Sequence, residues 1–445
     1  MFVRLENTPR DYAWGSTTAI AELLGRAPSG GPEAELWLGT HTGSPTRIAD
    51  PAQVGGHQTL AAWVAAEPEL TLGRARTQSP DEPAGKPSDG PAAPAEPAEP
   101  AALPFLLKIL AAAHPLSLQA HPSIAQAREG FAREEAAGVP LTSPSRNYKD
   151  RNHKPELIVA LSPTFEALCG FRAVDGVVNV LQEFIDRGAE AGQPVSALEA
   201  FVTELGRHGN AEEAVAWALE WLLTGSNGVH NLVTQCGAVA AIFPPLGTDT
   251  SHKKAVAEAA TVRELGAEYP GDPGIVLAIL LNRVSLKRGE ALYLPAGNMH
   301  AYLSGLGVEL MASSDNVLRG GLTPKHIDVA ELVAITQCAP LDIPLLSPKT
   351  LSPGVTVFAP AVPDFALVHV SLEQNSQGGQ ASVRFDGPAI VICTEGELTL
   401  SGERSSVTAH RGEFFFVTPD EGVVALNGFG EIFAARQGLS RVLEE

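Results

Sequence analysis

Cysteine is scarce in this sequence, and no two cysteines lie close together. The 445 residues include 4 cysteines, Cys169, Cys236, Cys338 and Cys393, all far apart along the chain. A disulfide framework or a structural zinc site requires cysteines at short, regular spacings. We therefore predict reduced thiols and a cytoplasmic protein.

A signal peptide and a long apolar run are also missing. The first residues, MFVRLENTPRDYAWGS, contain no basic stretch followed by an apolar one, so we expect no secretory signal. The apolar run GIVLAILL at 274–281 is too short to span a bilayer and is interpreted as a buried strand or a short helix. We expect no membrane partner.

Positive charge is in deficit. Lys and Arg number 31 against 51 Asp and Glu, which gives a net charge of −20. Such a surface disfavours nucleic acid and anionic membranes. The phosphate-binding loop GxxxxGK[ST] is absent, which argues against a fused nucleotide-dependent activity. An anionic small substrate remains possible if a local cluster of Lys and Arg reverses the field.

The length predicts two or three domains, and one segment cannot belong to any of their cores. Residues 77–102, TQSPDEPAGKPSDGPAAPAEPAEPAA, contain no aromatic residue, Val, Ile or Leu. Such a composition cannot bury enough surface to offset chain entropy, so we predict a disordered loop. A PxxP segment that docks a partner is the alternative.

Residues 174–266 have the periodicity of helices. In VDGVVNVLQEFIDRG the apolar residues follow the helical repeat. Ser196 and Glu199 are spaced as a capping box, Asn210 is a good N-cap for the next helix, and Ser251 is a plausible cap for a later one. We predict one helical module.

The flanking regions have the pattern of strands and turns. VSLKRGEALYLPAG and, more than a hundred residues later, SVTAHRGEFFFVTP each contain an Arg-Gly-Glu turn before an apolar strand. This weak internal repeat predicts two similar β-barrels or sandwiches, with the helical module inserted in the first.

The first repeat ends in a histidine on a tight turn. Gly289, Pro295, Gly297 and His300 have a spacing that resembles the second motif of the cupin jelly rolls, although Ser304 stands where that family usually has Asn. Gly297 permits the bend, and imidazole is the commonest metal ligand in proteins. The alternative is a core histidine satisfied by a backbone carbonyl.

Three candidate partners for His300 lie upstream. In HPLSLQAHPS, Gln119 and His121 are two residues apart and would share one face of a strand. Glu156 follows in NHKPEL. Two imidazoles, an amide oxygen and a carboxylate suit Zn²⁺ with one position left open. The alternatives are an ordinary polar–apolar strand and a loop salt bridge.

These motifs follow an order that resembles the type I mannose-6-phosphate isomerases. PRDYAWGS, AELWLGTH, LPFLLKILAAAHPLSLQAHP, NHKPEL, YLPAGNMHAYLSG and VELMASSDNVLRGGLTPKHID match in sequence order from Pro9 to Asp328, except in the proline-rich insertion. The resemblance implies a mostly β fold of two cupin-type jelly rolls plus an inserted helical domain. The implied divisions are a catalytic jelly roll formed by 1–165 and 269–330, a helical domain at 166–268 and a metal-free jelly roll at 331–445.

The resemblance also implies an activity and a metal. Mannose 6-phosphate and fructose 6-phosphate would interconvert through an enediol, with one zinc per chain held by Gln119, His121, Glu156 and His300. The metal would act as a Lewis acid while a base moves the proton. We expect a small sugar phosphate as the partner and a monomeric enzyme.

Further residues receive roles by resemblance or by position in the sequence. Arg319 is implied as catalytic, with an ion pair to Asp315 as the alternative. The general base is left open among three candidates: Lys108, His153 and Lys154. Lys108 could instead be a surface side chain whose ammonium group reaches solvent. Lys325 is a candidate phosphate contact, and four further residues are expected to line the pocket: Trp14, Glu35, Tyr302 and Glu309.

Two other functions compete with the isomerase. A non-catalytic cupin-type sugar-phosphate sensor would be expected to have lost a ligand or Arg319, and neither is lost. A cupin dioxygenase would place its glutamate close to the first histidine motif, whereas Glu156 lies far downstream of His121.

Overall fold

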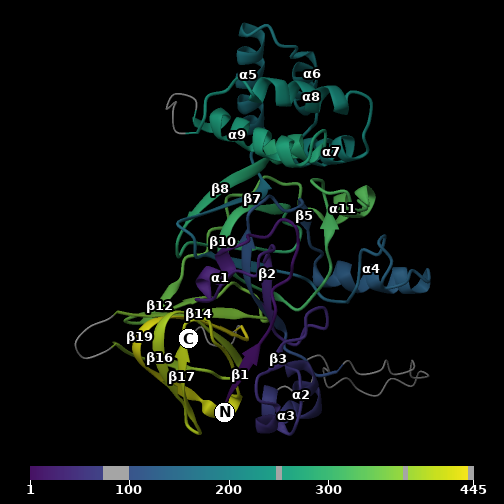
Figure 1. Cartoon of the computed structure of the whole chain (residues 1–445). Coiled ribbons are helices and arrows are strands. Elements are labelled where there is room, and N and C mark those ends of the chain that lie inside the picture. The colour runs from purple at the N-terminus through teal and green to yellow at the C-terminus, as the bar shows by residue number, and fades with distance from the viewer. Residues whose placement is uncertain (74–99, 247–252, 374–378, 439–445) are drawn as a thin grey trace.

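The structure of the chain, a computed structural model, describes residues 1–73, 100–246, 253–373 and 379–438. Most of the predicted loop at 77–102 lies outside these ranges, and so does Ser251. The described residues are mostly β-sheet with some helices. Figure 1 shows a group of helices at the top, one sheet in the middle and a second sheet below.

The middle part is a nine-stranded sheet organised around one long strand. Its strands are β2 (Glu35–Leu38), β4 (Phe105–Ala112), β5 (Gln119–Ala120), β6 (Glu156–Ala160), β7 (Thr164–Phe171), β8 (Leu281–Lys287), β9 (Ala291–Leu294), β10 (His300–Ala312) and β11 (Leu318–Arg319). β10 pairs antiparallel with β4, β5, β6 and β7. Side chains of β10 can therefore meet side chains from four other strands.

The lower part is a ten-stranded sheet. Its strands are β1 (Phe2–Glu6), β3 (Arg47–Ile48), β12 (Lys349–Ser352), β13 (Val355–Phe358), β14 (Ala366–Leu372), β15 (Gly379–Arg384), β16 (Ala389–Ser401), β17 (Ser406–His410), β18 (Phe414–Val417) and β19 (Val423–Arg436). β19 is its central strand and pairs antiparallel with β14, β15 and β16. The two sheets are thus built around one long central strand each.

The first strand of the chain belongs to the lower sheet. Phe2 lies opposite Val417 and Leu5 opposite Phe414, so β1 extends β18. The prediction that residues 1–165 lie in the first barrel is therefore wrong for β1 and for β3, which pairs with it. The physical reason is burial, because the alternate residues Val3 and Leu5 enter a core cluster that contains side chains of both sheets.

The repeated Arg-Gly-Glu turn is confirmed. Gly289 and Gly412 both have a φ of 85°, a left-handed conformation that glycine adopts without strain. The amide of Gly289 donates to the carbonyl of Ala160 at 2.8 Å, and the amide of Gly412 donates to that of Cys393 at 2.8 Å. Each turn opens a short strand, β9 or β18, which pairs with the equivalent strand, β6 or β16.

The helices are concentrated between two paired strands. They are α1 (Ala19–Leu23), α2 (Leu60–Ala66), α3 (Pro68–Leu72), α4 (Ile124–Ala136), α5 (Val174–Glu190), α6 (Ser196–Leu205), α7 (Ala211–Leu223), α8 (Val229–Ala240), α9 (Lys253–Glu268), α10 (Gly274–Leu280) and α11 (Val329–Ile335), with short 3₁₀ turns η1 (Pro51–Val54) and η3 (Pro419–Glu421). α5 to α10 follow β7 and precede β8, although β7 and β8 pair directly. They form the upper group in Figure 1.

The boundaries of this helical segment differ from the predicted 166–268. The helices begin at Val174, because β7 continues to Phe171, and they end at Leu280, because the run at 274–281 forms the buried helix α10 before β8. One predicted cap is confirmed, since the side chain of Asn210 accepts from the amide of Glu213.

The predicted capping box in the preceding helix is wrong. Ser196 is the first residue of α6 rather than its cap, and the cap position, Val195, makes no side-chain capping bond. The amide of Ala197 instead donates to Oε1 of Gln235 on α8 at 2.8 Å. A side chain from another helix thus satisfies the free amide that the capping box was expected to satisfy.

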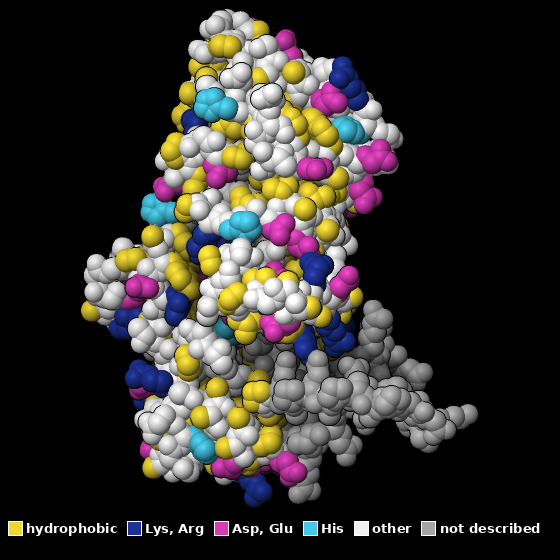
Figure 2. Space-filling view, turned by 90° about the vertical axis from the view of Figure 1, so that its right-hand side faces the viewer, with side chains coloured by type: hydrophobic (Ala, Val, Ile, Leu, Met, Phe, Trp, Pro, Cys, Tyr) yellow, Lys and Arg dark blue, Asp and Glu magenta, His cyan; other side chains and the backbone are white. Residues whose placement is uncertain are grey.

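The surface agrees with the mixed composition. On the described part of the face in Figure 2, basic side chains form small separate groups among acidic and apolar ones. Among the helices in the described ranges, none has the length and hydropathy needed to cross a membrane.

Candidate active site

The turn before β10 delivers His300 to the interior of the sheet. Gly297 has a φ of 78°, and a Cβ there would lie 3.1 Å from the carbonyl oxygen of Ile335. Its amide donates to the carbonyl of His121 at 2.8 Å. The turn therefore fixes His300 and ties it to the backbone of a second candidate ligand.

The short strand β5 lies between β10 and β11. Gln119 is opposite His300 on one side and opposite Arg319 on the other. The neighbours of Gln119, Leu118 and Ala120, are buried in the core cluster beneath the helices. The predicted alternation is confirmed, and three polar residues form a row across three strands.

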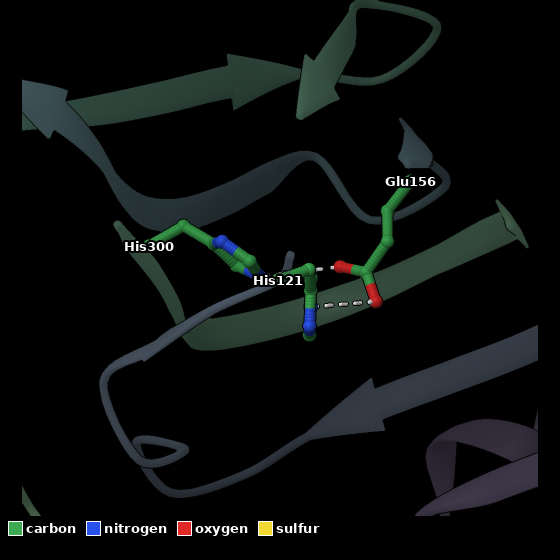
Figure 3. Close-up of side chains that lie close together, drawn as sticks. All are labelled: His121, Glu156 and His300. Atoms are coloured by element: carbon green, nitrogen blue, oxygen red, sulfur yellow. Dashed lines mark ion pairs between the residues drawn. The ribbon is translucent and has the colours of Figure 1, made fainter. Parts of the chain in front are cut away.

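His121, Glu156 and His300 converge in the interior, as Figure 3 shows. Nε2 of His121 is 3.3 Å from Oε1 of Glu156, and Nε2 of His300 is 3.2 Å from Oε2. Their ligand atoms lie within 4.8 Å of one another. Nε2 of Gln119 is 3.3 Å from Nε2 of His300. The four predicted ligands are therefore neighbours, and rotation of the Gln119 amide would turn its oxygen toward the group.

Backbone carbonyls orient both imidazoles. Nδ1 of His121 donates to the carbonyl of Asn316 at 2.8 Å, and Nδ1 of His300 donates to that of Asn298 at 3.0 Å. Both Nε2 lone pairs therefore face Glu156. Within the described residues, Nε2 of His121 and Oε2 of Glu156 are buried without a hydrogen bond. Buried polar atoms left unpaired in this way fit a divalent metal ligand set.

The electrostatics favour the forms that bind metal. Nζ of Lys154 donates to Oε1 of Glu156 at 2.5 Å. Burial opposes ionisation, but Lys154 and His121 hold the pKa of Glu156 well below its ordinary value. Burial and the Lys154 charge lower the pKa of His121 to about 4. A carboxylate and a neutral imidazole are the protonation states that metal binding requires.

Lys108 is buried rather than at the surface, so the alternative of a solvent-reaching side chain is wrong. Its ammonium group lies 2.9 Å from Oε2 of Glu309 and 3.4 Å from Oε1 of Glu35. Nε1 of Trp37 donates to the other oxygen of Glu35 at 2.9 Å. Although burial disfavours the charge, the two carboxylates raise the pKa of Lys108. The lysine is therefore charged and held in place.

A cavity of about 580 Å³ opens above these groups. Its lining contains most of the predicted site residues: Trp14, Glu35, Lys108, Gln119, Lys154, Glu156, Tyr302, Glu309, Arg319 and Lys325. His153 is not among them. Its Nε2 lies 2.9 Å from Asp364, so the prediction of His153 as a candidate base is not supported by its position.

Basic side chains gather at the mouth of the cavity. The guanidinium of Arg319 forms no hydrogen bond or ion pair among the described residues, and Asp315 is instead 3.3 Å from Nε2 of His41. Burial and the charges of Arg319 and Lys149 lower the pKa of Lys325. Lys149 was not predicted, although it lines the cavity and lies in the run NYKDRNHKPEL, which also contains the predicted residues His153, Lys154 and Glu156.

Two glycines follow Arg319, and each lies close to a neighbouring part of the chain. A Cβ on Gly320 would lie 3.1 Å from Met299, and one on Gly321 would lie 2.9 Å from the Cα of Gly274. Gly320 allows the segment after β11 to pack against Met299, and Gly321 allows it to pack against the start of α10. Close approach to a ligand is therefore not what requires glycine here.

Fold and site together define a mostly β protein with a buried His-Glu-His group beneath a polar, partly cationic cavity. The family model "Phosphomannose isomerase type I, catalytic domain" matches residues 2–82 and 86–174. The mannose-6-phosphate isomerase of Salmonella typhimurium is 35% identical, with 96% of this chain and 98% of that protein covered. The enzyme of the same name from Rattus norvegicus is 31% identical, with 93% of each covered. The chain therefore belongs to the type I phosphomannose isomerase family.

Solved structures agree with this assignment. A zinc-bound mannose 6-phosphate isomerase has a TM-score of 0.79 at 33% identity, with 98% of this chain and all of that one covered. A lysine-to-alanine variant of the phosphomannose isomerase from Salmonella typhimurium has a TM-score of 0.80 at 34% identity, with 98% of this chain and 100% of that chain covered.

Proposed function

We propose that this chain is a zinc-dependent isomerase that interconverts mannose 6-phosphate and fructose 6-phosphate. The observation that carries the proposal is the buried group of His121, Glu156 and His300, whose unpaired ligand atoms lie below a sugar-sized cavity. Relatives over almost the whole chain bear the name of this activity. A non-catalytic sensor would not need to keep all four ligands and Arg319.

Zinc would be held by Nε2 of His121, Nε2 of His300, the carboxylate of Glu156 and the amide oxygen of Gln119. These are ligand atoms that zinc accepts, and the mixture leaves room for a further oxygen ligand. Bound there, zinc would supply a Lewis acid that stabilises negative charge on sugar oxygens.

The proton transfer is assigned to the pair formed by Lys108 and Glu309. Isomerisation moves a proton from C2 to C1 of the sugar, so the site needs one group that accepts and returns it. Lys108 is held protonated by two carboxylates and cannot be a free base. Burial raises the pKa of Glu309 although Lys108 opposes this, which suits a carboxylate that exchanges a proton. Lys154 is paired with Glu156 in the metal group, so it is not assigned to the proton transfer.

The hydroxyl of Tyr302 is a further contact for the sugar. It is buried and makes no hydrogen bond of good geometry among the described residues, Glu309 lies close enough to raise its pKa, and Tyr302 lines the cavity. Burial and the neighbouring carboxylates raise its pKa well above the ordinary value, so the hydroxyl remains a donor. Trp14 and Glu35 also line the cavity.

The phosphate would bind at the cationic mouth. Arg319 and Lys325 both line it, and Arg319 lies in the same row as Gln119 and His300. A guanidinium without a carboxylate partner can hold phosphate or a developing oxyanion in bidentate geometry. Such a local positive field would allow a chain of net charge −20 to bind an anionic sugar.

The architecture proposed for this function is two cupin-type jelly rolls with a helical domain inserted in the first. The strand pairing supports it, since β6, β9 and β10 correspond to β16, β18 and β19. In the second sheet β16 and β17 are joined by residues 402–405, whereas in the first sheet helices α5 to α10 separate β7 from β8. The helices therefore occupy the place of a hairpin turn.

The same correspondence explains why one zinc per chain is expected. Glu156 lies opposite Met311 on β10, and its equivalent Ala389 lies opposite Arg436 on β19. By the same register Lys108 and Glu309 correspond to Val368 and Ala434. These three equivalents are apolar and lie in the core of the second sheet. We expect a monomeric, cytoplasmic enzyme without nucleic-acid or membrane partners.

The test is a coupled assay for fructose 6-phosphate formed from mannose 6-phosphate. We expect turnover that is lost on chelation and restored by zinc. Binding of mannose 6-phosphate without turnover in zinc-loaded protein would favour the sensor instead.

A further inference from the structure

Asn316 is fully buried between the metal group and the mouth of the cavity. Its backbone carbonyl accepts from Nδ1 of His121 at 2.8 Å. Its side-chain oxygen accepts from the amide of Lys149 at 2.7 Å, and its side-chain nitrogen donates to the carbonyls of Asp150 and Asn152, both at 2.9 Å. One residue thus contacts a proposed zinc ligand and fixes the backbone that carries Lys149.

A second set of hydrogen bonds, made by Asp150, joins the same two segments, 149–152 and 313–316, which together we call the clamp. The Asp150 carboxylate accepts from the hydroxyl of Ser314 at 2.8 Å, from Nδ2 of Asn316 at 3.1 Å and from the amide of Asp315 at 2.7 Å. Buried polar groups that are fully paired in this way give a segment one defined conformation. The segment 149–152 is therefore fixed against 313–316.

Lys149 forms no ion pair among the described residues, although its charge helps to lower the pKa of Asp315. The nearby carboxylate of Asp315 is 3.3 Å from Nε2 of His41. Lys149 lines the same cavity mouth as Arg319 and Lys325, and its charge is close enough to affect Lys325. Three cations that form no ion pair within the described ranges make the kind of field that binds a phosphate dianion.

We propose that Lys149 contacts the phosphate of the sugar substrate and that Asn316 is a positioning residue that holds Lys149 there. This inference rests on the proposed function. A lysine side chain loses rotamer entropy when it binds, and a fixed backbone limits that cost to the side chain alone. Asn316 would thus act on the phosphate end through its side chain, while its backbone carbonyl continues to orient His121.

The experiment is a double-mutant cycle on zinc-loaded protein, with calorimetric binding of sorbitol 6-phosphate, which has the phosphate but no carbonyl to isomerise. In Lys149→Met the Kd should rise about three- to tenfold, the range for an exposed charge-assisted contact. Asn316→Ala should raise it by a similar factor. The double variant should bind no more than about twofold more weakly than either single variant, because Asn316 acts through Lys149.

Lys325→Met provides the matched control. Combined with Asn316→Ala, its effect should multiply, since the side-chain hydrogen bonds of Asn316 go to residues 149–152 and not to Lys325. Where Asn316→Ala does not fold, Asn316→Ser is used, which keeps a small polar group at the position. Metal content is measured for each variant and should stay at the wild-type level.

Three results would overturn the inference: a Kd unchanged in Lys149→Met, multiplying effects of Asn316→Ala and Lys149→Met, or no binding of sorbitol 6-phosphate to the wild type. The isomerase assay distinguishes failure of this inference from failure of the proposed function. A wild type that binds the probe with the expected coupling but forms no fructose 6-phosphate would refute the activity and leave the phosphate contact standing.

Discussion

At the scale of single residues, the charges in the cavity differ in how firmly they are paired. Lys108 is held between Glu309 and Glu35, and Lys154 is paired with Glu156. Truncating one partner of a buried pair costs ~3–5 kcal/mol, because the other charge is left uncompensated. Variants of these lysines would therefore lose folding and activity together. Arg319 has no such partner in the part of the chain that the structure describes, and it gives the cleaner test.

We predict that Arg319→Ala keeps its metal and loses most of its turnover. Arginine has no lone pair to give, so it is not a ligand. Loss of a charge-assisted contact to a developing oxyanion costs ~10²–10³ in kcat. If the arginine acts on the sugar end, kcat falls with KM little changed, which is the outcome we expect.

The control for this prediction is His121→Ala, which should lose metal and activity together. Metal content and isomerase rate are measured on both variants. A strong rise in KM with normal kcat would assign Arg319 to phosphate alone, and near-normal values of both constants would remove it from the mechanism.

At the scale of elements, the turn before β10 sets the position of His300. Gly297 has a φ of 78°, and a Cβ there would be crowded against the carbonyl oxygen of Ile335 at 3.1 Å. We predict that Gly297→Ala is destabilised by ~1–2 kcal/mol from the left-handed conformation alone, and more from the collision. Because the turn carries a ligand, its zinc affinity should also fall, as measured by chelator competition.

Gly289 offers a matched control at the other end of β9. Its φ is 85°, and a Cβ there would meet nothing within 4 Å. Gly289→Ala should therefore lose stability but keep the zinc affinity of the wild type. Equal losses of affinity in the two variants would mean that the turn has no special link to the metal group.

The strands also show how much could be predicted from the sequence. The candidate ligand residues could be found, because alternation on β5 and the glycine-dependent turn are local properties. His153 and Lys154 could not be told apart, since adjacent residues point to opposite sides and only the folded chain decides which side is the cavity. The place of β1 could not be predicted either, because FVRLE fits the edge of either sheet equally well. The cap of α6 depended on Gln235, a residue from another helix.

At the scale of the whole molecule, zinc should stabilise the fold as well as serve catalysis. Binding to the folded state alone adds about 2.7 kcal/mol when the free metal is 100 times its Kd. We predict a higher thermal midpoint in excess zinc than in chelator, with one zinc per chain by elemental analysis. His300→Ala should lose most of this shift. A zinc-induced rise in thermal midpoint that is as large in His300→Ala as in the wild type would contradict a single zinc site, and so would two zinc ions per chain.

One ion-pair network joins the two sheets and predicts how stability depends on pH. Glu431 on β19 lies 2.9 Å from Nη2 of Arg288, which belongs to the turn before β9, and 3.0 Å from Nε2 of His369. It also accepts from Thr394 at 2.7 Å. Burial opposes ionisation, but the bonds from His369 and Thr394 and the charge of Arg288 hold the pKa of Glu431 below its ordinary value.

A carboxylate whose pKa is lowered in the folded state stabilises the fold at pH values above its unfolded-state pKa, which is about 4.3 for Glu. This stabilisation is lost as the pH falls through the folded-state pKa. We predict that Glu431→Gln is less stable than the wild type by ~1 kcal/mol at pH 7, a modest value because Arg288 is half exposed. The difference in urea midpoint between the two proteins should shrink below about pH 4.

Glu395→Gln on β16, an exposed side chain with no ion pair among the described residues, should show no such loss. A difference that stays constant from pH 7 into acid would mean that Glu431 stabilises the junction of the two sheets by packing rather than by charge.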